Sequence, residues 1–173
     1  MDLLVSSRKP FGLPTNFKDY VSEPTADKNI KIYRNGGVGF TSFDAIPKKD
    51  EYFDSIKVLV SKASPGADDY PHLVFSEPII AEKGTACTET YLVVSTVSNT
   101  DQANHLKRYM ATKFFRFLVL LVKNTQDVPK RVYAYVPQQN LNDEWNDEKL
   151  YSKYGITKEE VDFINTLVKD VVW

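Results

Sequence analysis

Apolar residues recur with the period of an α-helix along residues 103–123, and this pattern constrains the fold more than any other feature of the chain. The spacings of three and four residues form one stripe, which comprises Ala103, Leu106, Met110, Phe114, Phe117 and Leu121. Residues 99–101 (Asn-Thr-Asp) offer N-cap side chains, so the sequence predicts one long helix that ends at about Lys123. Residues 114–122 are apolar on nearly every side except at Arg116, which predicts that this end is buried between two layers.

The residues before this helix carry the two-residue period and the turn signals of β-structure. Residues 29–34 and 38–43 flank Asn-Gly-Gly at 35–37, a tight-turn signal that predicts a β-hairpin. Further strands are expected at 56–61, 72–75, 78–81, 88–96 and 131–136. Residues 64–69 are expected to form a loop. Strands, one long helix, a strand and then helices predict an α+β fold, with a mostly antiparallel sheet packed on the long helix.

Two short helices are predicted near the C-terminus. The first covers residues 147–154 and ends at Gly155, a residue suited to a left-handed C-cap. The second covers residues 158–172 and begins at a capping box formed by Thr157 and Glu160. These helices complete the predicted architecture.

The length of 173 residues fits one domain, which at this size buries ~70% of its unfolded surface. Residues 1–28 are rich in proline and other turn formers, so we expect an extended lead-in segment or linker there. Residues 29–173 are expected to form the single α+β domain. The one cysteine, Cys87, excludes an internal disulfide and suits a reducing compartment. With no apolar run of ~18 residues, we expect a soluble cytoplasmic protein that does not enter a membrane.

Charge is distributed unevenly although the net charge is only −1. Residues 140–173 hold eight acids and four lysines, whereas residues 103–131 hold seven cations and one acid. A basic middle beside an acidic end is compatible with a surface that faces phosphates. Many proteins with no such role show the same asymmetry.

The sequence contains no complete catalytic or metal-binding motif. The phosphate-binding loop pattern is absent, and the glycines at 36–39 lie in the predicted hairpin instead of before a helix. His72 and His105 lie in different elements, and Cys87 has the surroundings of a small buried hydrophobe. Acids near Lys83 or Lys149 resemble a magnesium nuclease site only weakly. We therefore expect no catalytic, metal-binding or cofactor-binding residues, and no enzyme activity for this chain alone.

Three features favour binding to a phosphate-rich partner. The extended segment 6–17 carries hydroxyls and two cations that can donate to phosphate oxygens, although a segment clamped on a sheet would look the same. The long helix carries a row of cations, which is equally typical of a solvated face. The amide side chains of Gln138 and Gln139 can read an adenine edge, or belong to an ordinary polar loop.

An ordered set of short motifs resembles the C-terminal target-recognition region of bacterial N6-adenine DNA methyltransferases, including fused restriction–modification enzymes. The motifs span nearly the whole chain and are 6–17 (SSRKPFGLPTNF), 88–91 (TETY), 112–118 (TKFFRFL), 123–126 (KNTQ), 132–138 (VYAYVPQ), 145–151 (WNDEKLY) and 153–157 (KYGIT). In that family a methyl-transfer domain precedes this region and holds S-adenosylmethionine and the flipped adenine. This sequence has neither of the corresponding loops, so the resemblance implies the recognition part of a larger enzyme, without the catalyst.

The resemblance implies a non-catalytic module that binds double-stranded DNA and selects the target sequence. The predicted DNA contacts are Ser7, Arg8, Lys9, Arg34, Arg108, Lys113, Arg116, Gln138 and Gln139. The parent enzyme would use S-adenosylmethionine in a catalytic domain upstream in the chain or in a partner, and in the fused enzymes of this group it would also carry a nuclease. As an alternative, the surplus of aromatic and apolar residues fits a scaffolding module that docks on a methylase or restriction partner, with little DNA contact of its own.

Overall fold

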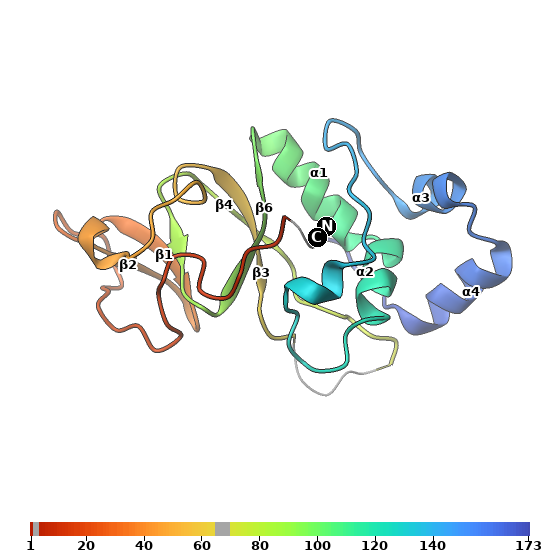
Figure 1. Cartoon of the computed structure of the whole chain (residues 1–173), viewed down its shortest axis with the longest axis horizontal. Coiled ribbons are helices and arrows are strands. Elements are labelled where there is room, and N and C mark those ends of the chain that lie inside the picture. Colours follow the sequence, from red (N-terminus) through yellow and green to blue (C-terminus); the bar gives the residue numbers. More distant parts are fainter. Residues whose placement is uncertain (2–3, 65–69) are drawn as a thin grey trace.

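A computed structural model describes residues 1, 4–64 and 70–173. The strands are β1 (Ile30–Arg34), β2 (Gly37–Thr41), β3 (Ile56–Ser61), β4 (Ile79–Ala81), β5 (Ala86–Cys87) and β6 (Tyr91–Val97). The helices are α1 (Thr100–Ala111), α2 (Lys113–Leu120), α3 (Asp147–Tyr154) and α4 (Lys158–Leu167), with short 3-10 turns η1 (Phe43–Ala45) and η2 (Lys130–Tyr133). Figure 1 shows the β1–β2 hairpin at one end of the molecule, β3, β4 and β6 in the middle, α1 and α2 beside them, and α3 and α4 at the other end.

The first sheet has the order β2-β1-β5 and contains the predicted hairpin. β1 and β2 pair antiparallel around the turn at 35–37, with Ile32 opposite Gly39. β5 pairs with β1 in parallel, so this sheet is mixed. Its core consists chiefly of Phe11, Leu13, Ile32, Tyr33, Ile46, Phe53, Leu59, Ala81, Ala86, Cys87 and Val93. The single cysteine is therefore a buried core residue, as its surroundings in the sequence indicated.

The second sheet has the order β4-β3-β6 and is antiparallel throughout. The strand predicted at 56–61 has these bounds, whereas the strand predicted at 88–96 begins later, at Tyr91. Residues 72–75 do not form the expected strand, because only His72 pairs, through an isolated parallel bridge to Val168. Residues 65–69 of the loop predicted at 64–69 lie outside the described residues. The mixed composition of strands and helices is confirmed, and the described residues form two small sheets where the sequence predicted one.

The predicted long helix is divided into α1 and α2 at Thr112, whose backbone is extended (φ −62°, ψ 147°). Asn99 caps α1 as expected, and the hydroxyl of Thr112 accepts a hydrogen bond from the Phe115 N–H at 3.1 Å and so caps α2. A break of this kind resets the helical phase: Phe114 of the predicted stripe is still buried, but the stripe does not continue to the end of α2. Leu121 is consequently 61% exposed, although the sequence pattern placed it in the core.

The strand predicted at 131–136 is wrong, because this segment forms η2 and a following turn. Pro129 begins it, and the Val132 N–H donates to the Pro129 carbonyl at 3.0 Å. Val132, Tyr133 and Val136 are all buried, whereas a strand with one covered face would bury alternate residues. The β-branched and aromatic composition of this segment reflects burial against the helices.

Both C-terminal helices begin at the predicted residues, and α3 also ends as predicted. α3 has the predicted bounds and ends at Gly155, whose φ of 65° is the left-handed conformation that glycine permits. The capping box of Thr157 and Glu160 begins α4. This helix ends at Leu167, before the predicted end at residue 172. None of the helices in the described part of the chain is long and apolar enough to span a membrane.

Residues 4–20 consist of turns and irregular backbone, and part of this segment packs into the interior. Ser6 and Val93 exchange two hydrogen bonds, from the Ser6 N–H to the Val93 carbonyl at 2.8 Å and from the Val93 N–H to the Ser6 hydroxyl at 3.0 Å. Phe11 is fully buried and Leu13 is 1% exposed, in the core of the first sheet. These contacts fix the position of Ser7, Arg8 and Lys9 relative to β6.

Candidate nucleic-acid interface

A buried carboxylate, Glu89, brings three cations together at one edge of the molecule. Glu89 lies in the loop between β5 and β6, and its side chain is 5% exposed. The Arg8 Nε donates to one carboxylate oxygen, and the Lys62 Nζ lies 3.5 Å from the same oxygen. The Lys9 Nζ lies 3.4 Å from the other oxygen. Arg8, Lys9, Lys62 and Glu89 are called the Glu89 cluster below.

Backbone contacts explain why these four residues meet. Lys9 has a positive φ of 59°, and its carbonyl accepts from the Gly12 N–H at 3.0 Å, so the chain turns here. The Glu89 N–H donates to the Leu13 carbonyl at 2.9 Å, directly after this turn. The Lys62 N–H donates to the Thr90 carbonyl at 2.8 Å. The N-terminal segment, the end of β3 and the β5–β6 loop are therefore bonded to one another.

The charge balance of the Glu89 cluster is positive. Burial alone would raise the pKa of the Glu89 carboxyl, but the Arg8 hydrogen bond and the charges of Arg8, Lys9 and Lys62 outweigh it and lower the pKa below its usual range. The carboxylate is therefore ionised at neutral pH. Three cations against one carboxylate leave an excess of two positive charges.

A cleft of about 290 Å³ lies beside the Glu89 cluster. Its lining residues are Ser6, Ser7, Arg8, Lys62, Leu92, Asp127, Pro129 and Lys130. Three of the predicted DNA contacts, Ser7, Arg8 and Lys9, thus meet at one place, and Arg8 is 72% exposed in its side chain. Lys62 and Lys130 join them here, although neither was among the predicted contacts. No local signal in the sequence distinguishes these two lysines from other surface lysines.

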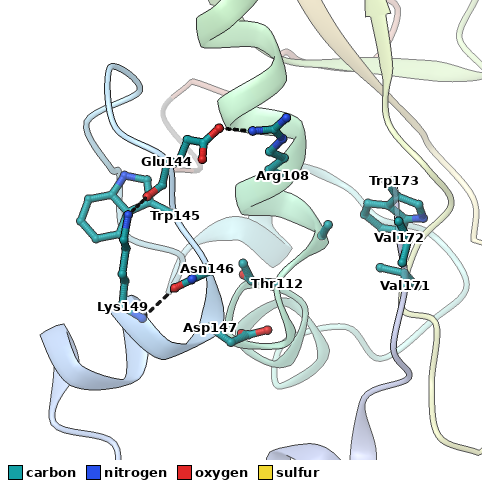
Figure 2. Close-up of a pocket in the computed structure, with 11 residues that line it drawn as sticks. Arg108, Thr112, Glu144, Trp145, Asn146, Asp147, Lys149, Val171, Val172 and Trp173 are labelled. Carbon is teal, nitrogen blue, oxygen red and sulfur yellow. Dashed lines mark hydrogen bonds and ion pairs between the residues drawn. The ribbon is translucent and has the colours of Figure 1, made fainter.

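Arg108 belongs to a different and larger pocket of about 420 Å³, where α1 meets the start of α3 and residues 171–173. Figure 2 shows Arg108 paired with Glu144, with Trp145 on one side and Trp173 on the other. The Lys149 Nζ donates to the Glu144 carbonyl at 2.9 Å. The Arg108 charge is thus compensated by Glu144, and the Lys149 ammonium is bonded to the backbone of the same residue.

Arg116 is not on the exposed face that the helical pattern assigned to it. Its side chain is buried, with 1% exposure of the residue. The Arg116 Nε donates to the Ala111 carbonyl at 3.2 Å, and the guanidinium lies 5.6 Å from the Trp173 ring centre. Burial lowers the pKa of Arg116 to about 10, which leaves it charged at neutral pH. The break at Thr112 rotates α2 relative to the predicted helix and so turns this cation inward.

The other predicted contacts are dispersed. Lys113 is 13% exposed in its side chain and contacts Asp170 at 2.9 Å and Asn165 at 2.8 Å. Arg34 lies on β1, with its guanidinium 4.1 Å from the Tyr20 ring centre. Neither residue lines the cleft beside the Glu89 cluster.

The two glutamines differ from each other. Gln138 is exposed at a small cleft lined also by Leu106 and Leu141. The Gln139 amide donates to the Tyr154 hydroxyl at 2.8 Å and accepts from the Lys153 Nζ at 2.7 Å. Gln139 is therefore engaged within the fold, whereas Gln138 remains at the surface.

The described residues show no grouping of His, Cys, Asp and Glu that would hold a metal ion. His105 lies on α1, and its ring Nδ1 lies 2.8 Å from the Leu141 carbonyl oxygen. Burial raises the pKa of the Cys87 thiol, so it is protonated at neutral pH. Within the described part of the chain, the Glu89 cluster and its cleft are thus the arrangement best suited to contact an anionic partner.

No model of a known protein family matches this chain, and no curated protein matches it.

Proposed function

We propose that this chain is the DNA-recognition module of an N6-adenine DNA methyltransferase or restriction–modification enzyme, and that the Glu89 cluster and its cleft contact the DNA backbone. The observation that carries the proposal is the convergence of Ser7, Arg8 and Lys9 with Lys62 and Lys130. Arginine, lysine and hydroxyl side chains are the usual donors to phosphate oxygens. The segment that bears three of these residues is also the first motif of the family resemblance.

Backbone contacts of this kind hold a duplex in register without reading its sequence. Target selection therefore requires base contacts elsewhere, for which exposed amides such as Gln138 are suited. With a net charge of −1, we expect weak affinity for DNA without further cations. The proposed parent enzyme supplies them in a catalytic domain that also holds S-adenosylmethionine.

The test is binding of a fluorescent duplex, followed by anisotropy at about 50 mM salt and at rising salt. We expect Arg8→Ala and Lys62→Ala each to weaken binding and to reduce the slope of log affinity against log salt by about one. Lys158→Ala is the matched control, because it removes an exposed cation from α4 in the acidic part of the chain. No binding to any duplex pool at low salt by the folded protein would refute the proposal.

A scaffolding module is the second candidate, and one observation favours it. Leu121 and Phe163 are 61% and 56% exposed, and the Phe163 ring lies 6.2 Å from that of Phe117, so apolar residues of α2 and α4 gather at the surface. Under this alternative the module docks on a methylase or restriction partner. Leu121→Ser and Phe163→Ser would then weaken binding to the separately expressed partner, and Arg8→Ala would not.

A further inference from the structure

The carboxylate of Glu89 is surrounded by three cations and is buried. Arg8, which is hydrogen-bonded to it, nevertheless extends into solvent. The Glu89 side chain is 5% exposed and the Arg8 side chain is 72% exposed. One carboxylate oxygen contacts Arg8 and Lys62, and the other contacts Lys9. Glu89 is therefore the common point from which three long and flexible side chains are held.

The position of Glu89 is itself fixed by the backbone. Its N–H bonds to the Leu13 carbonyl, and the next residue, Thr90, accepts from the Lys62 N–H through its own carbonyl. Arginine and lysine side chains lose several rotatable bonds of freedom when they bind a ligand. A carboxylate in a fixed place removes part of that freedom before the ligand arrives.

Arg8 contacts Glu89 through its Nε, which leaves the edge formed by its two terminal amino groups for a ligand. Glu89 takes the Arg8 Nε, and no described residue is bonded to the two terminal amino groups of Arg8. These two groups form a planar pair of donors that matches two oxygens of a phosphate. Lys62, which Glu89 also holds, lines the same cleft together with Ser7 and Lys130.

We infer that Glu89 is a positioning residue, which holds Arg8 and Lys62 so that the cleft beside them receives one phosphodiester group of the DNA backbone. This inference rests on the proposed function, because it takes duplex DNA as the ligand. Under this inference, the anionic Glu89 strengthens the binding of an anionic ligand. Charge alone predicts the opposite, since removal of a carboxylate leaves the surface more positive.

Positioning predicts that loss of the Glu89 charge weakens DNA binding, and charge alone predicts that it strengthens binding. Glu89→Gln tests this directly, because it keeps the shape of the side chain and removes its charge. Anisotropy with the same fluorescent duplex at fixed low salt is expected to show a loss of affinity of about tenfold. Asp127→Asn is the matched control, because Asp127 lines the same cleft and removal of its charge leaves Arg8 in place. We expect this control to bind as tightly as the wild type, or more tightly.

Arg8→Lys supplies a second measurement on the wild-type Glu89 background. Lysine keeps the charge but lacks the paired donors, so we expect it to lose most of the affinity that Arg8→Ala loses. This variant decides the question if Glu89→Gln fails to fold, as judged by its unfolding midpoint. Wild-type affinity in Arg8→Lys would overturn the inference, and so would wild-type or tighter binding in folded Glu89→Gln.

The DNA contact at the cleft and the role of Glu89 are tested separately. If Arg8→Ala weakens DNA binding while Glu89→Gln and Arg8→Lys do not, the cleft binds DNA and only the role of Glu89 is wrong. If Arg8→Ala and Lys62→Ala both leave binding unchanged, the cleft is not the DNA contact and the proposed site is wrong as well.

Discussion

The Asp147 carboxylate, at the start of α3, accepts a hydrogen bond from the Phe114 N–H in the first turn of α2, at 2.8 Å. Its second oxygen accepts from the Lys113 N–H at 3.0 Å. The first N–H groups of a helix have no partner within the helix and carry partial positive charge. A residue of one helix therefore caps another helix, and this contact connects the C-terminal helices to the core.

Asp147→Ala is expected to lower the free energy of unfolding by about 1–2 kcal/mol, because it leaves two N–H groups of α2 without their acceptor. Urea unfolding followed by circular dichroism measures the change. Glu148→Ala is the control: it removes the neighbouring acid, which is exposed, and we expect a change of about 0.5 kcal/mol or less. Equal effects of the two substitutions would show that general charge, and not the cap, is responsible.

Arg116→Ala is expected to act on folding and not on binding. The substitution removes a large buried side chain and the donor to the Ala111 carbonyl, so we expect a loss of about 2–4 kcal/mol. Arg108→Ala removes a largely exposed cation whose ion pair with Glu144 contributes about 1 kcal/mol or less. Urea midpoints of the two variants make the comparison. A stable Arg116→Ala protein with reduced DNA affinity would contradict this assignment.

Local signals in the sequence identified most of the helices and strands. The turn at 35–37, the left-handed Gly155 and the capping box at Thr157 are each determined by a few adjacent residues, and all three are present. The break at Thr112 was not identified, because the apolar spacing continues through it without interruption. The contacts that stabilise the break are only partly local: Thr112 itself caps one N–H of α2, and Asp147, distant in the sequence, accepts from two others.

The candidate site was predictable only in part, for the same reason. Ser7, Arg8 and Lys9 stood out because they are adjacent in an extended and polar segment. Glu89 and Lys62 join them through backbone bonds between segments that are far apart in the sequence, and no local pattern reports such bonds. Arg116 was misplaced because its orientation depends on the helical phase after the break.

Gly39→Ala is expected to destabilise the hairpin. A Cβ at this position would lie 2.8 Å from the Tyr20 ring and 3.3 Å from the Arg34 Nε, so the stacked pair would have to separate or shift. Overpacking of this kind costs about 1–3 kcal/mol. Val38→Ala, at the neighbouring and partly exposed position, serves as the control with a smaller expected effect. Equal stability of Gly39→Ala and the wild type, by thermal or urea unfolding, would contradict the close packing.

Lys57 makes the stability depend on pH in the alkaline range. Its side chain is buried, its Nζ donates to the Glu82 carbonyl at 2.9 Å, and burial lowers its pKa to about 8. Below pH 8 the lysine is protonated in both the folded and the unfolded chain. Between pH 8 and about 10.5 the folded protein releases this proton while the unfolded chain retains it, so the contribution of Lys57 to stability rises with pH.

Comparison of the protein with its Lys57→Met variant isolates the contribution of Lys57. Both are best measured in a background that also carries Cys87→Ala. Burial raises the pKa of the Cys87 thiol, so the folded protein retains a proton that the unfolded chain releases above about pH 8.5, and stability falls with pH through this group. With the thiol removed, the difference in free energy of unfolding between the chain that keeps Lys57 and the Lys57→Met variant is expected to increase in favour of lysine from about pH 7.5 to about 9.5. Urea unfolding at a series of pH values measures it. A flat or decreasing difference would mean that the folded protein keeps Lys57 charged through this range, with its two backbone carbonyl acceptors compensating the burial.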